Sequence, residues 1–414
     1  MIHERKDCRA CGSTRLEAIL DLGRTALAND FLDPGEVAAY RTFLPLRLRL
    51  CRDCSLAQLA DVVDPGVLYS RYAYVTSTSR TMDAHLAAQA GDVLNSAGGQ
   101  PKKVLEIASN TGLYLQKFKT LGCEVLGVEP ARNIAELAEQ AGIPTWTDFF
   151  NARTARQIRE EWGAPDLILG RHVFAHIDDL KDLMQSLDAV SHQSTLVGFE
   201  VPYLVDLFEK TEFDTIYHEH LSYVPVRAVE ALLRGTPFQL ERVAHYAIHG
   251  GSILFQFRRR AAGVPVHASV AAALARETQL GLSDPQNWRE FTQRVSKIRK
   301  VLPEMIRKLK SQGKRIIGYG ASAKGNTLLN TSGLKAGDLD YIIDNTPFKQ
   351  GKVAPGSWIP VRPPERLLED QPDYALLLAW NFATEIVARE QEYQKRGGRF
   401  ILPIPAPTIV DFKP

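Results

Sequence analysis

The sequence has no surplus of charge of either sign. Its 50 lysines and arginines nearly balance its 48 aspartates and glutamates, which leaves a formal net charge of +2 over 414 residues. Nucleic acids and anionic membranes attract proteins through dense positive charge, and this balance indicates neither partner. We therefore expect no nucleic acid and no membrane among the partners of this chain.

Long apolar runs are also missing. No stretch reaches the roughly 18 residues that a membrane-spanning helix needs, and residues 1–7 are too polar for the core of a signal peptide. The content of 45% hydrophobic and 24% charged residues is that of an ordinary globular protein. We expect a cytoplasmic protein, and its length indicates two or three domains.

Cysteine is scarce, yet four of the five cysteines form two Cys-x-x-Cys pairs, Cys8 with Cys11 and Cys51 with Cys54. In a reducing compartment, two such pairs indicate a tetrahedral zinc site, with redox or disulfide use as the alternative. Because sulfur would fill all four positions, the zinc ion would be structural. Residues 1–75 alternate short apolar runs with turns, which predicts a small β-rich module around the metal.

The chain lacks a Gly-x-Gly-x-x-Gly motif where its first nucleotide-type strand and helix meet. Residues 103–112 form an apolar run that ends in small residues, and a helical pattern follows over 113–121. Glu129 closes the next strand, and residues 143–150 then place an acid beside an aromatic residue. This order resembles that of a class I S-adenosylmethionine methyltransferase, whereas a nicotinamide dehydrogenase would need the missing phosphate-binding loop.

A second pattern of strand, loop and helix lies over residues 314–327. Its strand leads directly into two glycines separated by one residue, and donors to phosphate oxygens follow. A further strand then ends in an acid. These donors and the acid are Ser322, Lys324, Asn326 and Asp344. The chain thus predicts two nucleotide-type folds in tandem, one for a cofactor and one for a nucleotide-bearing substrate. An NAD-dependent oxidoreductase or epimerase that uses the second fold is the alternative.

Between the two folds, Tyr217-His218-Glu219-His220 concentrates a phenol, two imidazoles and a carboxylate. Such a cluster is either a site or a polar loop, because each of these groups must be solvated or hydrogen-bonded. Imidazoles and carboxylates also bind metals, but adjacent side chains point in different directions and cannot converge on one ion. We interpret the cluster as the proton-handling edge of a cleft.

Together these motifs resemble a known family, the sugar C-methyltransferases that act on nucleotide-linked keto-deoxysugars in antibiotic and surface-polysaccharide pathways. The resemblance runs through the two cysteine pairs and residues 104–112, 127–131, 174–176, 213–220, 249–252, 318–330 and 349–351. It implies an α/β protein with three parts: a zinc-binding module at 1–75, a class I methyltransferase Rossmann-like domain at 76–290, and a second Rossmann-like domain that binds the nucleotide-sugar at 291–414.

The resemblance implies C-methylation of a nucleoside-diphosphate 4-keto-deoxysugar, at C-3 beside the ketone, with C-5 as the alternative ring position. Formation of a C–C bond needs a base to remove the proton α to the carbonyl and a donor to the enolate oxygen. The implied base is His220, oriented by Glu219. Tyr217 is expected to bind the substrate, and His176 to donate to the ketone oxygen.

The resemblance also implies two groups of binding residues. S-adenosylmethionine is expected to contact Glu106, Ala108, Asn110, Gly112, Glu129, Pro130, Asn133, Asp148 and Phe149. The nucleotide-sugar is expected to contact Tyr72, Tyr74, Arg171, His172, His249, Ser322, Lys324, Asn326, Asp344 and Lys349. Two positions depart from the family pattern, since Thr111 replaces an aspartate and Arg171-His172 replaces a pair of asparagines. The second departure bears on the choice of sugar.

Overall fold

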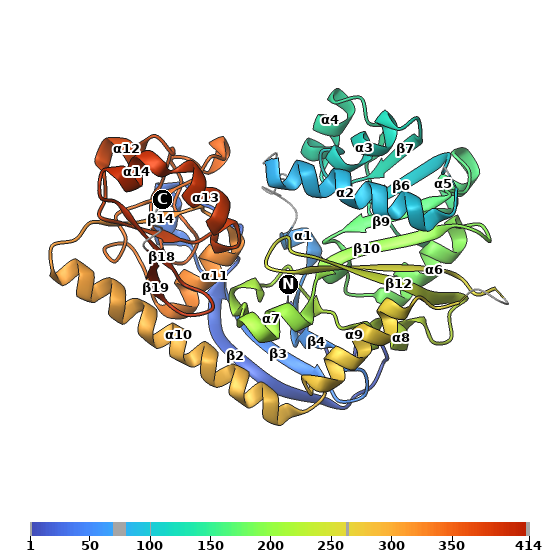
Figure 1. The fold of residues 1–414 in the computed structure, drawn as a ribbon, viewed down its shortest axis with the longest axis horizontal. Coiled ribbons are helices and arrows are strands. Elements are labelled where there is room, and N and C mark those ends of the chain that lie inside the picture. Colours follow the sequence, from blue (N-terminus) through green and yellow to red (C-terminus); the bar gives the residue numbers. More distant parts are fainter. Residues whose placement is uncertain (1, 69–79, 100, 262–264, 411–414) are drawn as a thin grey trace.

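The structure is a computed structural model, and it describes residues 2–68, 80–99, 101–261 and 265–410. Figure 1 shows two lobes side by side, with a long helix, α10 (Pro285–Ser311), and the strands of the N-terminal module beneath them. Within the described ranges, no helix is both long and apolar enough to cross a membrane.

The N-terminal module is built on antiparallel strands. Its elements are β1 (Ile2–Glu4), β2 (Leu16–Ala26), η1 (Pro34–Ala39), β3 (Phe43–Cys51), β4 (Ala57–Leu59), β5 (Asp61–Val63) and α1 (Pro65–Leu68). Buried and partly exposed residues alternate along β3, as the period of its sequence predicts. The sheet has the order β11-β4-β3-β2, and its edge strand β11 (Ser222–Tyr223) comes from the middle of the chain.

The middle domain holds a seven-stranded sheet in the order β12-β13-β10-β9-β6-β7-β8. Its strands are β6 (Lys103–Ile107), β7 (Glu124–Val128), β8 (Thr145–Trp146), β9 (Leu167–Arg171), β10 (Leu196–Pro202), β12 (Phe238–Tyr246) and β13 (Ser252–Arg259). All neighbours are parallel except those of β13, which is antiparallel to β10 and β12. This strand order is that of a class I methyltransferase and confirms the expected fold.

Helices cover both faces of this sheet, which explains why its central strands are apolar throughout. The helices of the middle domain are α2 (Arg80–Ala97), α3 (Leu113–Thr120), α4 (Arg132–Gln140), α5 (Ala152–Glu161), η2 (Phe174–His176), α6 (Leu180–Val190), α7 (Leu204–Lys210), η3 (Phe213–Thr215), α8 (Val226–Leu233) and α9 (Ala268–Gln279). The short η2 and η3 follow strands β9 and β10 in the chain and lead to the candidate site.

The C-terminal domain has a six-stranded sheet in the order β16-β15-β14-β17-β18-β19, parallel except for β19. Its elements are β14 (Ile316–Tyr319), α11 (Ala323–Ser332), β15 (Ile342–Ile343), η4 (Pro347–Lys349), β16 (Val361–Arg362), α12 (Arg366–Asp370), β17 (Tyr374–Leu377), η5 (Trp380–Phe382), α13 (Ala383–Arg389), α14 (Gln391–Lys395), β18 (Arg399–Leu402) and β19 (Thr408–Val410). The predicted second Rossmann-like fold is therefore present.

Helix α10 ties the domains together. Asp284 caps its first turn, and an apolar stripe that includes Trp288, Phe291 and Val295 is buried along it. The helix packs on β2 and α11, and one continuous apolar core contains residues of all three domains. The expected boundary between residues 290 and 291 lies inside this helix, so the chain passes from the middle to the C-terminal domain without a loop at that point.

Candidate active site

The four paired cysteines converge at one end of the N-terminal module. Their sulfur atoms all lie within 4.8 Å of one another, with Cys8 and Cys54 Sγ 3.4 Å apart and Cys11 and Cys51 Sγ 3.5 Å apart. A tetrahedral zinc site with Zn–S bonds of about 2.3 Å needs sulfur separations of about 3.8 Å. The four thiols are unpaired with one another as disulfides. The geometry fits a closed, structural zinc ion, and Zn²⁺ is its metal.

A small cavity opens at the carboxyl ends of β6 and β9, at the edge where a class I sheet binds its cofactor. Its lining residues are Met82, Glu106, Ala108, Ser109, Asn110, Leu113, Tyr114, Arg171, His172 and His249. Three of the expected cofactor residues, Glu106, Ala108 and Asn110, thus lie together. The family resemblance assigns Arg171, His172 and His249 to the substrate, and the structure places them at the same cavity.

Two buried carboxyls shape this cavity. Burial raises the pKa of Glu106 to about 8, and its Oε2 has no hydrogen-bond partner among the described residues. A buried carboxyl oxygen without a partner fits a cationic or hydrogen-bond-donating part of a ligand. Glu129 instead accepts from the backbone of Asn110 and Ala131, each at 3.0 Å. It thereby joins the end of β7 to the loop before α3.

Backbone strain gathers at the same cavity. Ala108, Asn110, His172 and His249 have φ values of 54°, 50°, 57° and 56°. Non-glycine residues adopt this left-handed region at an energetic cost and usually where the surrounding structure fixes them for a purpose. Strain at four lining positions supports a ligand site at this sheet edge. The His172 and His249 rings face each other edge to face, 4.8 Å apart.

His220 and Tyr217 form a hydrogen-bonded pair. The Tyr217 hydroxyl lies 2.7 Å from His220 Nε2, and His220 Nδ1 lies 3.0 Å from the carbonyl oxygen of Thr215. Because a carbonyl only accepts, Nδ1 carries the proton and Nε2 keeps the lone pair. Burial, together with the nearby His176 and His172, holds the pKa of His220 well below its usual 6.5. The imidazole is therefore neutral, as a base must be.

His176 lies on the other side of His220, with ring centroids 5.0 Å apart. Burial lowers the pKa of His176 to about 4, so this imidazole is neutral as well and can donate one N–H. The expected catalytic residues Tyr217, His220 and His176 therefore lie together.

The N-terminal module holds the loop that carries these residues from behind. Leu59 donates its N–H to the Leu221 carbonyl, β11 pairs with β4, and His218 Nε2 lies 3.2 Å from the Pro45 carbonyl. His218 is thus a packing residue. Glu219 turns away from His220, because its carboxylate accepts from Asn29 Nδ2 at 2.8 and 3.0 Å. Glu219 therefore makes no direct hydrogen bond to the His220 ring that it is expected to orient.

Arg171 is fixed by a buried acid that carries no functional assignment in the sequence motifs. Its Nε lies 2.8 Å from Glu200 Oε2, and His85 Nε2 lies 2.9 Å from the other oxygen of Glu200. The Arg171 charge holds the pKa of Glu200 well below its ordinary value against the effect of burial. This network crosses from α2 to β10 and closes one side of the cavity.

The C-terminal domain reaches the same region through Lys324. Lys324 Nζ donates to the His249 carbonyl at 2.8 Å, lies 3.9 Å from Glu212 Oε2, and stands 5.1 Å from the Trp380 ring centroid. Trp380 in turn donates to the buried Asp214 at 2.6 Å. Burial raises the pKa of Glu212 to about 7 and that of Asp214 to about 6. Lys324 therefore joins two domains at the candidate site.

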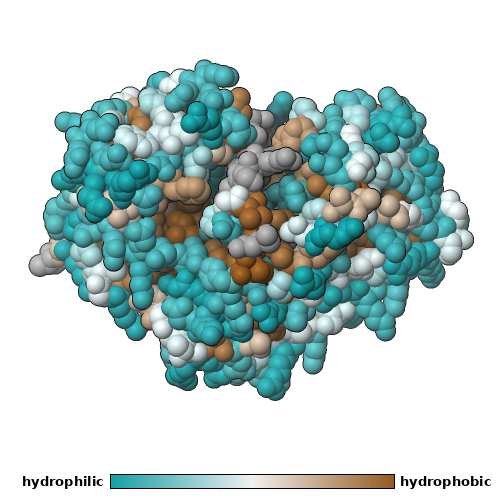
Figure 2. All heavy atoms as spheres, turned by 180° about the vertical axis from the view of Figure 1, so that it is seen from behind, coloured by the Kyte–Doolittle hydropathy of each residue, from teal (hydrophilic) through white to brown (hydrophobic). Residues whose placement is uncertain are grey.

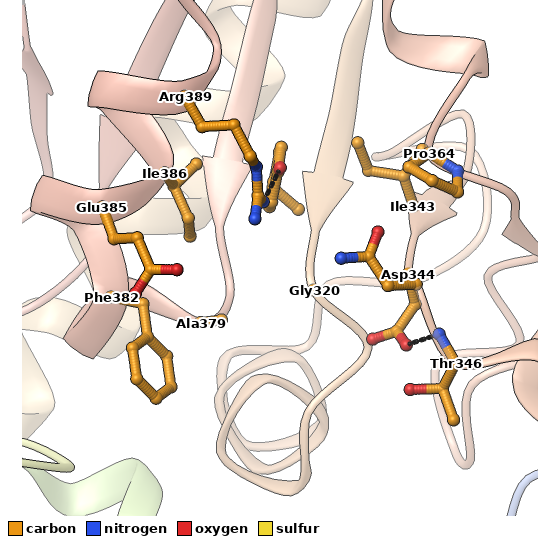
Figure 3. A pocket seen from close by; sticks show the side chains of 12 residues that line it. Gly320, Ile343, Asp344, Thr346, Pro364, Ala379, Phe382, Glu385, Ile386 and Arg389 are labelled. Carbon is orange, nitrogen blue, oxygen red and sulfur yellow. Dashed lines mark hydrogen bonds between the residues drawn. The ribbon is translucent and has the colours of Figure 1, made fainter. Parts of the chain in front are cut away.

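A second cavity, of about 230 Å³, lies at the carboxyl ends of β14 and β15 in the C-terminal domain. Figure 3 shows Asp344, Thr346 and Pro364 on one side of it and Phe382, Glu385 and Arg389 on the other. Asp344 accepts from the backbone of Ala321 and Thr346 at 2.7 and 2.8 Å. The expected strand-end acid thus lies in a cavity, at the position where such folds bind nucleotides.

The other expected C-terminal residues occupy different places. Ser322 caps α11 by accepting from the Gly325 N–H, and Lys349 Nζ donates to the Ala321 carbonyl. Asn326 is fully buried and donates to the Ala28 carbonyl at 2.7 Å, so it joins two domains. None of the three lines either cavity. The packing of α11 against the N-terminal segment thus engages the Asn326 amide, and the first turn of α11 engages the Ser322 hydroxyl, although the sequence pattern predicts both as donors to phosphate.

The remaining expected residues lie at the periphery or outside the described ranges. Gly112 begins α3, and Pro130 and Asn133 lie at the start of α4, while Asp148 accepts from the Phe149 N–H. Phe149 is 49% exposed, which leaves its ring free to stack on a ligand. Tyr72 and Tyr74 lie outside the described residues.

Several residues of the site could not be read from the motifs. Glu200 had one signal, because an acid inside an apolar strand needs a buried partner. Asp214 lies in the 213–220 segment of the resemblance, which gave it no role. Asn29, Glu212 and Trp380 had no signal, since each acts through a contact with a distant part of the chain. Figure 2 shows apolar surface gathered in the hollowed middle of one face, between two hydrophilic lobes.

Comparison with known proteins places this geometry in context. Residues 8–69 match a family described as "Putative zinc binding domain". Residues 82–243 match a family described as "Methyltransferase domain", and residues 247–405 match one described as "C-methyltransferase C-terminal domain". The chain is similar to C-methyltransferase NovU of Streptomyces niveus, with 37% identity over 98% of this chain and 96% of that protein.

Two solved structures are similar to part of this chain. One is magnesium protoporphyrin IX methyltransferase of Synechocystis PCC 6803 with bound SAH, 12% identical over 48% of this chain and 100% of that one, with a TM-score of 0.38. The other is N-methyltransferase NodS of Bradyrhizobium japonicum WM9, 13% identical over 45% of this chain and 100% of that one, with a TM-score of 0.34.

Proposed function

This chain belongs to the C-methyltransferase family, and on that premise we propose that it methylates a ring carbon of a nucleoside-diphosphate 4-keto-deoxysugar, at C-3 beside the ketone. The enzyme class, an S-adenosylmethionine-dependent C-methyltransferase, follows from the family and the sheet order. The substrate rests on one observation. A neutral His220, whose Nε2 lone pair accepts from Tyr217, lies near His172 of the cofactor-type cavity and near Lys324 of the C-terminal domain.

The residues support proton abstraction from carbon. A keto-sugar becomes a carbon nucleophile when a base removes the proton α to its carbonyl, and a neutral imidazole suits this step near pH 7. Tyr217 donates to the same Nε2 in the free enzyme, so its hydroxyl lies where the proton leaves the substrate. His176, 5.0 Å from His220 between ring centroids, is placed to donate to the oxygen that gains charge.

S-adenosylmethionine supplies the electrophilic methyl group when it is bound. Glu106, Ala108 and Asn110 would hold it at the ends of β6 and β9, with Glu129 fixing the loop and Phe149 offering a face for stacking. The unpaired, buried Oε2 of Glu106 fits the ammonium group of an amino-acid ligand. These are the residues expected from the sequence, and their role in binding is part of the proposal.

The nucleotide end of the substrate is assigned to the cavity of Figure 3. Asp344 keeps lone pairs that can accept from ribose hydroxyl groups. Asn345, Glu385 and Arg389 offer hydrogen-bond donors and acceptors for the nucleobase. Arg171 and His172, which are larger and more basic than a pair of asparagines, crowd the methyl-transfer side instead. We assign them to the selection of the sugar, together with His249.

The test is a transfer reaction with a panel of keto-deoxysugar nucleotides and S-adenosylmethionine that carries a ¹³C-methyl group. After reduction of the ketone with borohydride, carbon–carbon coupling in the NMR spectrum locates the label on the ring. We expect the methyl group on C-3. A label on C-5 would move the proposal to the other α-carbon, and a label on oxygen or nitrogen would refute the enolate mechanism.

A further inference from the structure

One segment of the zinc-binding module contacts the loop that carries His220. After β2 ends at Ala26, residues 27–32 form a turn that faces the loop carrying His220. In this turn, Asn29 Nδ2 donates to both carboxylate oxygens of Glu219, at 2.8 and 3.0 Å. Glu219 is 5% exposed, and within the described ranges its carboxylate accepts hydrogen bonds from Asn29 alone. Asn29 belongs to none of the motifs that indicated function.

We propose that Asn29 is a positioning residue for the methyl transfer: it holds the Glu219 carboxylate and thereby fixes the peptide that joins Glu219 to His220. This inference rests on the proposed function, since it concerns the base of that reaction. It also gives the zinc-binding module a part in catalysis. The zinc ion stabilises the module, and the module in turn supplies the amide that anchors the loop.

The turn around Asn29 is held on both flanks by the C-terminal domain. Asn326 donates to the Ala28 carbonyl at 2.7 Å, and Lys349 Nζ lies 5.2 Å from the centroid of the Phe31 ring. Leu32 forms a β-bridge with Val353. An asparagine on an unsupported surface turn would hold nothing in place. Here three contacts to a neighbouring domain fix the backbone on either side, so the amide can impose a position on Glu219.

The loop on the other side of the contact is equally constrained. Leu221 donates to the Ala175 carbonyl at 2.7 Å, and Leu59 donates to the Leu221 carbonyl at 3.0 Å. Between Tyr217 and Leu221, His218 also contacts the Pro45 carbonyl, but Glu219 is the residue whose peptide bond leads directly into His220. Loss of a donor to a buried carboxyl leaves it unsatisfied, and such groups rearrange to find new partners. Rearrangement at Glu219 would shift His220 by way of the shared peptide bond.

Electrostatics agree with this geometry. Burial raises the pKa of Glu219 to about 7, and the Asn29 amide is the group that opposes this rise. The imidazoles on either side, His218 and His220, are kept neutral by burial and supply no compensating charge. An Asn29→Ala variant should therefore hold a protonated Glu219 to higher pH than the natural protein does.

The kinetic test compares Asn29→Ala with Asn287→Ala. The Asn287 amide also donates to two oxygens, the Leu280 and Gly281 carbonyls at 3.0 and 3.2 Å, but it does so at the start of α10, away from the site. We expect kcat to fall by about 10- to 100-fold in Asn29→Ala, with KM for S-adenosylmethionine changed by less than about twofold. Asn287→Ala should keep the natural kcat. An unchanged kcat in Asn29→Ala would overturn the proposal.

A double variant separates positioning from a general loss of structure. If Asn29 acts through Glu219, Asn29→Ala should have little further effect on kcat in a Glu219→Ala background. If the two losses multiply, the residues act independently and the proposal is wrong. Asn29→Ala should also retain one zinc ion per chain, which shows that the module has stayed folded.

A measurement of the Glu219 pKa needs no turnover, so it tests the Asn29 contact independently of the proposed reaction. NMR of protein labelled with ¹³C at the glutamate carboxyl carbons, assigned with Glu219→Gln, gives the pKa of Glu219 directly. We expect a higher pKa in Asn29→Ala than in the natural protein and in Asn287→Ala. If no keto-sugar were methylated but this pKa shift were found, the contact between Asn29 and Glu219 would be confirmed and the proposed reaction would be refuted. If the pKa were unchanged, the contact itself would be refuted.

Discussion

At the scale of single residues, the site depends on an imidazole whose tautomer is set by its neighbours. The Thr215 carbonyl accepts a hydrogen bond from the protonated Nδ1 of His220, and Nε2 therefore keeps the lone pair that a base needs. The sequence cluster around Tyr217 pointed to this histidine. It could not show that His218, two residues away, turns to a backbone carbonyl of the N-terminal module, because that contact spans 173 positions of the chain.

Replacing His220 by asparagine should remove the base and keep much of the local hydrogen bonding. We expect kcat to fall by about 10²- to 10⁴-fold, which is the range for loss of a general base. Binding of S-adenosylmethionine, measured by calorimetry, should change little because the cofactor cavity does not include His220. His218→Asn is the matched control in the same loop, and a comparable loss of kcat there would contradict the assignment.

Glu106→Gln tests the unpaired carboxyl at the cofactor cavity. The pKa of Glu106 is about 8 in the folded protein against an ordinary 4.5, so the folded state keeps a proton that the unfolded state releases. Stability from this group therefore falls as pH rises from about 4.5 to 8. Glutamine cannot ionise and avoids this loss.

The free energy of unfolding of Glu106→Gln, relative to the natural protein without ligand, should thus increase between pH 5 and pH 8. The gain is at most about 1.4 kcal/mol per pH unit. Urea titrations at the two pH values measure it. The same variant should bind S-adenosylmethionine more weakly. A stability difference that is the same at pH 5 and pH 8 would show that Glu106 is ionised in the free enzyme.

At the scale of elements, strands were easier to anticipate than the contacts between them. The alternation along β3 and the apolar run of β6 have periods that local sequence determines. The pairing of β11 with β4 joins residues 222–223 to residues 57–58, and no local pattern encodes a partner so far away. The same holds for Asn326, whose spacing suggested a phosphate donor but whose amide meets the Ala28 carbonyl.

The turn before β13 is an element that only glycine can build. Gly250 has a φ of 102°, and a Cβ there would lie 2.4 Å from a carboxylate oxygen of Glu212. Gly250→Ala should therefore displace Glu212 and the adjacent His249, whose carbonyl binds Lys324. We expect a lower melting temperature and reduced kcat. Gly235→Ala is the matched control, because its φ of 78° imposes a similar strain while nothing lies within 4 Å of its Cβ position.

A thermal shift assay and a rate measurement on both variants decide this point. If the two alanine variants lose the same stability and activity, backbone strain alone explains the effect. The close contact between the turn and Glu212 would then have no special role.

At the scale of the whole molecule, the three domains share one core and one site. The two patterns of strand, loop and helix, each followed by a strand-end acid, were enough to predict two nucleotide-type folds in tandem, and the sheet orders confirm both folds. The contacts of Lys324 with the His249 carbonyl and of Asn29 with Glu219, which join the C-terminal and N-terminal domains to the middle domain, could not be predicted. Such contacts depend on the packing of α10 and β2, which no motif describes.

Removal of zinc should therefore affect more than the N-terminal module. A chelator, or the Cys51→Ser variant, is expected to release the metal, unfold the module and free the loop that β4 and Asn29 hold. Activity should fall together with the zinc content measured by atomic absorption. Cys123→Ser is the control, because Cys123 lies outside the sulfur cluster and donates to the Pro101 carbonyl. Full activity in a zinc-free protein would show that the module does not support the site.

The central claim is that His220 takes a proton from the carbon beside a sugar ketone, and hydrogen exchange tests it most directly. The enzyme, a 4-keto-deoxysugar nucleotide and S-adenosylhomocysteine are incubated in D₂O, and the ring protons are followed by NMR against an enzyme-free sample. We expect the natural protein to exchange the C-3 proton faster than the enzyme-free rate, and His220→Asn to show no acceleration. Equal exchange in His220→Asn and the natural protein would contradict the assignment of the base.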